Sequence, residues 1–124
     1  MHRILIIDDE EDVLIPLKNL LEKEGFQVAT LSRGGTTFKT VEVFKPDVML
    51  LDIKLSEFDG RDICWELKTN KKTKNIKIIL CSAHVLAENG YVDYGADDFI
   101  GKPFKLQTLL KKIKHHIKEA EKNF

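Results

Sequence analysis

Cysteine and long apolar runs are both scarce in this chain. Only two cysteines, Cys64 and Cys81, occur among its 124 residues. Two thiols are too few for a disulfide framework and lack the spacing of a zinc site, so we expect both to be reduced thiols in the core. No apolar run approaches the roughly 20 residues that a membrane span requires. The stretch before the first acids is also too short for a secretory signal, which makes a cytoplasmic location the default expectation.

Net charge is also absent, because 20 basic residues balance 20 acidic ones. The signs are nevertheless separated: residues 1–60 hold 7 Lys/Arg against 12 Asp/Glu, and residues 105–124 hold 6 Lys against 2 Glu. A basic tail could be a nucleic-acid footprint, but no aromatic side chain interleaves its lysines as a stacking platform would require. Lysines near a helix C-terminus also offset the helix dipole. We therefore do not expect nucleic-acid contact.

Short apolar runs alternate with longer segments of helical period, and no repeat or linker interrupts them. This alternation is typical of βα units around a buried parallel sheet. The expected strands are residues 4–7, 28–31, 48–53, 76–81 and 99–100. Because 124 residues suffice for one core, we predict a single domain over residues 1–124, built as a three-layer α/β sandwich.

The expected helices differ in how clearly the sequence marks them. The last has one apolar stripe, formed by Leu106, Leu109, Leu110, Ile113 and Ile117. The first spans residues 12–23, although Pro16 inside it predicts either a kink or a later start. The segments "GGTTFKTVEVF" and "VLAENGYVDYG" are weaker. Gly90 interrupts the latter at a cost of roughly 1 kcal/mol relative to alanine, so we expect a short fourth helix.

Polar side chains stand where four of the expected strands end. Asp8 and Asp9 follow the first strand, Asp52 ends the third, Ser82 closes the fourth and Lys102 follows the fifth. Ligands meet open α/β sheets at the carboxyl ends of the strands, so we expect these residues to face one cleft. Three carboxylates cannot all stay ionised in a partly dry cleft unless a cation joins them, and hard oxygen ligands suit Mg²⁺. The pattern predicts a magnesium site in which Mg²⁺ and Lys102 together balance the three carboxylates.

Four motifs, in this order and at these separations, resemble those of response regulator receiver domains, the phosphoacceptor part of two-component signalling. They are "DD" after the first strand, "LLDIKLSEFDG" around the third, "SA" after the fourth and "KPF" after the fifth. The resemblance covers the whole chain. It implies a flavodoxin-like, doubly wound sheet of five parallel strands in the order 2-1-3-4-5, with five helices.

The resemblance also implies a role for each acid. Asp52 would be the phosphoacceptor, taking a phosphoryl group from the phosphohistidine of a sensor histidine kinase or of a phosphotransfer protein. Asp9 would bind Mg²⁺ directly, Asp8 would bind it mainly through water, and Asp52 and the backbone carbonyl of Lys54 would complete the protein ligands. Such a domain is not an enzyme in the usual sense, because it catalyses only its own phosphorylation and dephosphorylation.

The same resemblance implies a conformational switch. Lys102 would pair with one phosphoryl oxygen, and the hydroxyl of Ser82 would donate to another. Phe99 matches the switch aromatic of the family, whose ring turns inward when Ser82 moves toward the phosphate. A cis bond is expected before Pro103, since proline reduces the preference for trans to roughly 0.5–1 kcal/mol.

Two further positions, Lys54 and His84, flank the open side of the phosphoryl group in the receiver family. Bulk or charge there can exclude or orient the hydrolytic water, so we expect these side chains to set the lifetime of the phosphorylated state. The resemblance also places a surface for phosphorylation-dependent dimerisation or effector binding at the fourth helical segment. Because the sequence ends with the last expected helix, we expect either a stand-alone regulator, which we favour, or a receiver excised from a longer protein. The sequence names neither its kinase nor its target.

Each site residue also has a structural interpretation. Asp8, Asp9 or Asp12 could cap the first helix, Asp52 and Ser82 could serve a turn or a cap, Lys102 could be a solvated loop residue, and Phe99 could be a core residue. Four other acids, Asp47, Asp59, Asp97 and Asp98, are expected only in turns and caps, beside Pro46, Gly60 and Gly95.

Rival functions are weaker. A haloacid dehalogenase-type phosphatase needs a second Asp two residues after Asp52, where Lys54 stands. In an FMN-binding flavodoxin the acid pair would repel the phosphate, and Gly34-Gly35 lacks the spacing of a phosphate loop. The remaining alternative is a receiver that serves as a phosphorylation-independent interaction module or as a phosphate sink in a phosphorelay.

Overall fold

Five parallel strands form one sheet in the order β2-β1-β3-β4-β5, as the sequence predicts. In this computed structural model the described residues are 1–122, and for residues 85–89 the description covers the backbone only. The strands are β1 (Arg3–Ile7), β2 (Gln27–Leu31), β3 (Val48–Asp52), β4 (Lys77–Ser82) and β5 (Asp98–Gly101). Each expected strand is found within one residue of its predicted bounds. The carboxyl ends of all five therefore lie at one edge of the sheet.

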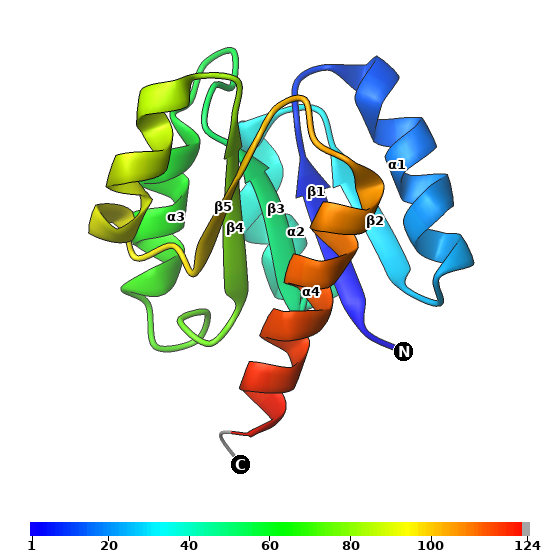
Figure 1. The fold of residues 1–124 in the computed structure, drawn as a ribbon. Coiled ribbons are helices and arrows are strands. Elements are labelled where there is room, and N and C mark those ends of the chain that lie inside the picture. Colours follow the sequence, from blue (N-terminus) through cyan, green and yellow to red (C-terminus); the bar gives the residue numbers. More distant parts are fainter. Residues whose placement is uncertain (123–124) are drawn as a thin grey trace.

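Helices cover both faces of this sheet and form the two outer layers of a three-layer sandwich (Figure 1). They are α1 (Glu11–Lys23), α2 (Thr37–Phe44), α3 (Gly60–Lys68) and α4 (Leu106–Glu121), with shorter 3-10 helices η1 (Gly34–Thr36) and η2 (Val85–Tyr94). Across residues 1–122, none of the helices has the length and apolar character needed to cross a membrane.

The prediction of five α-helices was wrong by one, because residues 85–94 form the 3-10 helix η2. Asn89 and Gly90 in the middle of the segment are both poor helix formers, which explains why the i to i+4 bonding pattern does not develop. The later start considered for the first helix is also excluded, since α1 begins at Glu11 and continues through Pro16.

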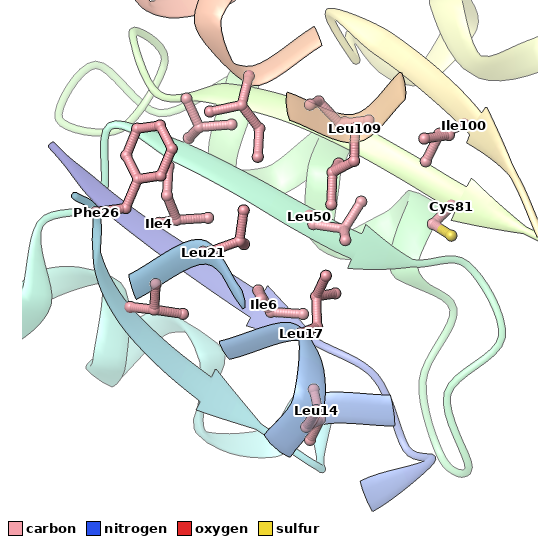
Figure 2. Close-up of a cluster of buried hydrophobic side chains, with 14 of the residues drawn as sticks. Ile4, Ile6, Leu14, Leu17, Leu21, Phe26, Leu50, Cys81, Ile100 and Leu109 are labelled. Carbon is pink, nitrogen blue, oxygen red and sulfur yellow. The ribbon is translucent and has the colours of Figure 1, made fainter. Parts of the chain in front are cut away.

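Two hydrophobic clusters, one on each face of the sheet, hold the layers together. Leu14, Leu17 and Leu21 of α1 pack with Leu109 and Ile113 of α4 against one face (Figure 2). The apolar stripe predicted for the last helix is thus confirmed as core. On the other face, the residues of α2 and α3 that pack against the sheet are Val41, Ile63, Cys64 and Leu67.

Both thiols are free and buried, as predicted, and they lie in different clusters. Burial raises the pKa of Cys64 and of Cys81 to about 12, so neither forms a thiolate near neutral pH. Their role is packing.

Gly60 allows α3 to start directly beneath the end of β3. A Cβ atom at this position would overlap the backbone carbonyl oxygen of Asp52. The amide of Gly60 donates to the carbonyl oxygen of Ile53 at 2.7 Å, which closes the loop between the strand and the helix. Asp59 then caps the helix by accepting from the amide of Arg61 at 2.9 Å, as the sequence predicts. Glycine at residue 60 thereby fixes the backbone around Asp52.

Candidate functional site

Lys102 is the centre of the polar cluster at the carboxyl edge of the sheet. Its Nζ atom lies 2.6 Å from Oδ2 of Asp8 and 2.9 Å from Oδ2 of Asp52. Both carboxylates are almost fully buried, with side chains 7% and 8% exposed, and the lysine side chain is 18% exposed. One ammonium group therefore bridges the acids that follow β1 and end β3.

The electrostatics of this cluster are unbalanced toward negative charge. Burial raises the pKa of Asp52, and the charge of Asp8 adds to that effect, while the hydrogen bond from Lys102 opposes it. Burial alone would lower the pKa of the Lys102 ammonium group, but its hydrogen bonds to both carboxylates raise that pKa above its usual range. Lys102 thus stays charged, and one positive charge is shared by more than one carboxylate.

Asp9 completes a set of three carboxylates that could hold a cation. One oxygen from each of Asp8, Asp9 and Asp52 lies within 4.8 Å of the others. Asp9 is half-buried, and its Oδ2 atom accepts a hydrogen bond from the hydroxyl of Ser56 at 3.2 Å. An all-oxygen donor set that is open on one side fits Mg²⁺, which prefers oxygen ligands and keeps several of its waters.

Local hydrogen bonds orient two of these carboxylates. Oδ1 of Asp8 accepts from the amide of Glu10 at 2.9 Å, just before α1 begins. Oδ1 of Asp52 accepts from the amide of Lys54 at 3.2 Å. In each case the other oxygen, Oδ2, is the one that meets Lys102. Asp8 does not cap α1, whose N-cap residue is Glu10 without a side-chain capping bond, so the capping role considered for Asp8 is wrong.

Ser82 lies at the end of β4 and is buried. Its Oγ atom accepts a hydrogen bond from the amide of His84 at 2.9 Å. The backbone carbonyl oxygen of the same serine accepts from the amide of Lys102 at 2.9 Å, which ties β4 to the residue that follows β5. The hydroxyl oxygen is thus engaged by the loop, and no acceptor of its hydrogen is found among the residues whose side chains the structure describes.

The predicted switch residue, Phe99, lies on the face of β5 that packs toward α3 and η2. Its ring is buried and stacks on Tyr91 of η2, with ring centroids 6.3 Å apart and planes at 26°. The ring is therefore turned inward. Tyr91 was not identified from the sequence, since its segment carries no helical apolar stripe. The cis peptide bond predicted between Lys102 and Pro103 is present.

Lys54 and His84, the predicted lifetime residues, both have exposed side chains. They follow Asp52 and Ser82 in the loops at the carboxyl edge, so they border the cluster from the solvent side. Their placement is compatible with contact to an incoming water, and equally with simple extension into solvent.

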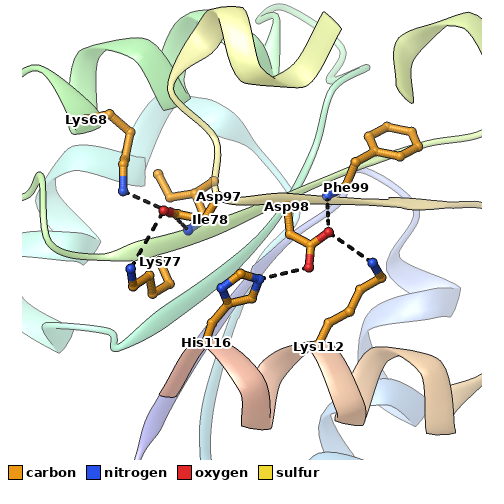
Figure 3. A network of polar contacts seen from close by, with 8 residues as sticks. All are labelled: Lys68, Lys77, Ile78, Asp97, Asp98, Phe99, Lys112 and His116. Carbon is orange, nitrogen blue, oxygen red and sulfur yellow. Dashed lines mark hydrogen bonds and ion pairs between the residues drawn. The ribbon is translucent and has the colours of Figure 1, made fainter. Parts of the chain in front are cut away.

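The acids at the start of β5 do more than the predicted turn formation (Figure 3). Asp97 accepts from Lys68 of α3 and from the amide of Ile78, each at 2.8 Å. On the other side of the strand, Oδ2 of Asp98 lies 2.8 Å from Nε2 of the buried His116. These two acids fasten β5 to a helix on each face of the sheet.

Asp98 has two more partners. Its Oδ1 atom accepts from Lys112 of α4 at 2.9 Å and from the amide of Phe99 at 2.8 Å. Burial alone would raise the pKa of Asp98, but the hydrogen bonds from His116 and Lys112 lower it. Lys112 and His116 lie four residues apart and so share one face of α4, but the sequence alone does not pair that face with Asp98.

Comparison with known proteins identifies the family that has this arrangement of carboxylates, serine and lysine at one sheet edge. A sequence model of the response regulator receiver domain matches residues 4–114. The chain belongs to this family. It is a receiver domain of the two-component response regulator type.

Curated relatives are longer proteins. The alkaline phosphatase synthesis transcriptional regulatory protein PhoP of Bacillus subtilis is 31% identical over 119 residues, which are 96% of this chain and 50% of that protein. The nisin biosynthesis regulatory protein NisR of Lactococcus lactis is 34% identical over 126 residues, which are 99% of this chain and 53% of that protein. The chain spans about half the length of these relatives.

Solved receiver structures share the fold along the whole chain. A CheY-like response regulator receiver domain protein from Methanospirillum hungatei superposes with a TM-score of 0.92 at 31% identity, covering 100% of this chain and 99% of that one. A two-component response regulator from Clostridium difficile gives a TM-score of 0.86 at 25% identity, covering 95% and 97%. The receiver fold predicted from the motifs is confirmed.

The buried charge of Asp52 generates a stability prediction. Because the folded-state pKa of Asp52 is raised, the folded protein binds that proton more tightly than the unfolded chain, and stability falls as pH rises through this titration. In EDTA, Asp52→Asn should therefore exceed the parent in free energy of unfolding by on the order of 1 kcal/mol at neutral pH. The gain should vanish below about pH 4, where Asp52 is protonated in both states.

Urea denaturation across this pH range measures the difference. Glu66→Gln, on the exposed surface of α3, removes one carboxylate of ordinary environment and serves as the control with no such gain. If the parent is more stable than Asp52→Asn at neutral pH, the charge of Asp52 does not destabilise the folded protein, and the prediction is contradicted.

Proposed function

We propose that this receiver takes a phosphoryl group on Asp52 and uses the resulting change to regulate a partner protein in the cytoplasm. The observation that supports this most is the single ammonium group of Lys102 held between Asp8 and Asp52, beside a third carboxylate, Asp9. Phosphoryl transfer needs positioning and positive charge around the equatorial oxygens more than any covalent help. Lys102 supplies one such charge, and the acids can hold another.

The proposed donor is the phosphohistidine of a sensor histidine kinase or of a phosphotransfer protein. A carboxylate oxygen of Asp52 attacks phosphorus, the P–N bond breaks, and the leaving imidazole nitrogen takes a proton. The product is an acyl phosphate on Asp52. Lys102 then contacts one phosphoryl oxygen, and the hydroxyl hydrogen of Ser82 is free to be donated to another. The domain acts only on itself, through its own phosphorylation and dephosphorylation, and residues 1–124 form one receiver domain.

Asp8, Asp9, Asp52 and the backbone carbonyl of Lys54 are the residues that would hold Mg²⁺. When bound, Mg²⁺ supplies positive charge that offsets the carboxylates and the phosphoryl oxygens. The count of charges supports this assignment, because three clustered carboxylates face one ammonium group and a divalent cation would balance them.

For the switch, Ser82 has to turn its hydroxyl toward the phosphate and donate its hydrogen to a phosphoryl oxygen, while its oxygen is the acceptor of the His84 amide. Phe99 and Tyr91 would carry the change to η2, the proposed surface for an effector or for phosphorylation-dependent dimerisation. One relative, PhoP, is named a transcriptional regulatory protein, and this chain covers 50% of it, so we propose a protein and not DNA as the direct partner of this domain.

One observation favours a second candidate function. The ring of Phe99 is buried and stacks on Tyr91, which is the inward arrangement that the switch is expected to reach after phosphorylation. A receiver held in that arrangement would bind its partner regardless of phosphorylation, or would serve only as a phosphate sink in a phosphorelay.

Incubation with acetyl phosphate and Mg²⁺ tests the proposed function. Mass spectrometry should show one phosphoryl adduct on the parent and none on Asp52→Asn, and EDTA should abolish labelling of the parent. Lys102→Met should be labelled at least tenfold more slowly, because a charge-assisted contact to the phosphoryl oxygens is lost.

Asp62→Asn, which removes an exposed acid in the first turn of α3, controls for loss of any nearby carboxylate. Equal labelling of Asp52→Asn and the parent would contradict the proposal. Amide shifts near Phe99 and Tyr91 on adding beryllofluoride separate the candidates: a shift supports the switch, and its absence supports the sink or the constitutive module.

The lifetime of the phosphorylated state should depend on Lys54 and His84. Lys54 is suited to contact phosphoryl oxygens and shield them, whereas a neutral histidine at residue 84 can accept a proton from the attacking water. Lys54→Ala should therefore shorten the lifetime by up to about tenfold, equivalent to about 1.4 kcal/mol of barrier. His84→Ala should lengthen the lifetime, because a group that can accept a proton from the attacking water is lost. Decay of phosphorylated protein measures both effects, and parent-like rates in both variants would exclude the role.

A further inference from the structure

Asp9 differs from the other two acids of the cluster in how it is held. Asp8 and Asp52 are each tied to Lys102. In the part of the chain that the structure describes, the carboxylate of Asp9 has one hydrogen-bond donor, the hydroxyl of Ser56 at 3.2 Å. This contact joins the loop after β3 to the residue that follows β1, 47 positions away in the sequence.

The loop that carries Ser56 is closed by its own backbone. Lys54 and Asp59 form an antiparallel bridge, the amide of Leu55 donates to the carbonyl oxygen of Phe58 at 3.2 Å, and Gly60 donates to Ile53 at 2.7 Å. Ser56 therefore sits at the tip of a short hairpin-like loop that is anchored at both ends. Its hydroxyl is presented to Asp9 by a braced backbone.

The hydrogen bond from Ser56 opposes the charge repulsion between Asp9 and the other two carboxylates. Three carboxylate oxygens within 4.8 Å of one another repel, and the more exposed Asp9 is the one free to turn away into solvent. A donor on Oδ2 opposes that movement. The contact borders a cavity of about 290 Å³, which is lined by Asp9, Ser32, Arg33 and Ser56 among others, so Asp9 has open space to turn into.

We propose that Ser56 is a positioning residue for Mg²⁺, acting through Asp9. This inference rests on the proposed function. Its hydroxyl holds Asp9 in the ligand arrangement before the cation arrives, so the cation does not have to gather a dispersed carboxylate. Hydrogen-bond partners of metal ligands characteristically raise metal affinity in this way.

A Mg²⁺ titration followed by amide chemical shifts tests the proposal without any phosphorylation. Ser56→Ala should raise the Mg²⁺ dissociation constant roughly three- to tenfold. Ser56→Thr keeps the hydroxyl on an exposed loop and should restore parent affinity. Ser32→Ala removes a hydroxyl from the same cavity without touching Asp9 and should leave the affinity unchanged.

Labelling by acetyl phosphate adds a second readout. Ser56→Ala should need more Mg²⁺ to reach half-maximal rate and should match the parent at saturating Mg²⁺. Parent affinity in Ser56→Ala, or a loss that Ser56→Thr does not repair, would overturn the role of Ser56. A parent that binds Mg²⁺ but is not labelled would instead overturn the proposed function and leave the positioning role supported.

Discussion

The bridge from Lys102 to Asp8 and Asp52 joins three strand ends that are far apart in the sequence. Its short distances, 2.6 and 2.9 Å, and the low exposure of all three side chains make it the strongest polar contact at the carboxyl edge of the sheet. The backbone bond from Lys102 to Ser82 adds β4 to the same junction. A change in charge at Asp52 therefore acts directly on Lys102, which follows β5, through their hydrogen bond.

Ion pairs hold both ends of β5, so a movement of Lys102 acts directly on this strand. Lys102 fixes its carboxyl end, while Asp97 and Asp98 fasten its start to α3 and α4. Phe99 lies between these anchors, and its amide is one of the donors to Asp98. Local backbone around the phosphoacceptor is equally constrained, since only glycine at residue 60 leaves room for the carbonyl oxygen of Asp52.

Sequence pattern predicted the sheet and the meeting of polar side chains at its carboxyl edge, for physical reasons. Strands buried on both faces read as continuous apolar runs, and parallel strands must end at one edge, so Asp8, Asp52 and Lys102 could be placed together before any coordinates. The prediction of an α-helix for residues 85–94 was wrong, because low helix propensity shows that an α-helix is weak there but does not indicate which other structure forms. Ser56 and His116 could not be found, because their partners Asp9 and Asp98 are 47 and 18 residues away and tertiary packing alone brings them together.

The central claim is that Lys102 compensates the charge of Asp52 in the folded receiver. It is tested most directly by following the carboxyl carbon of Asp52 through a pH titration by NMR, in EDTA, in the parent and in Lys102→Met. We expect the pKa of Asp52 to be higher in Lys102→Met than in the parent. Burial and the charge of Asp8 raise this pKa, and the variant has lost the ammonium group that lowers it. An unchanged or lower pKa in the variant would contradict it.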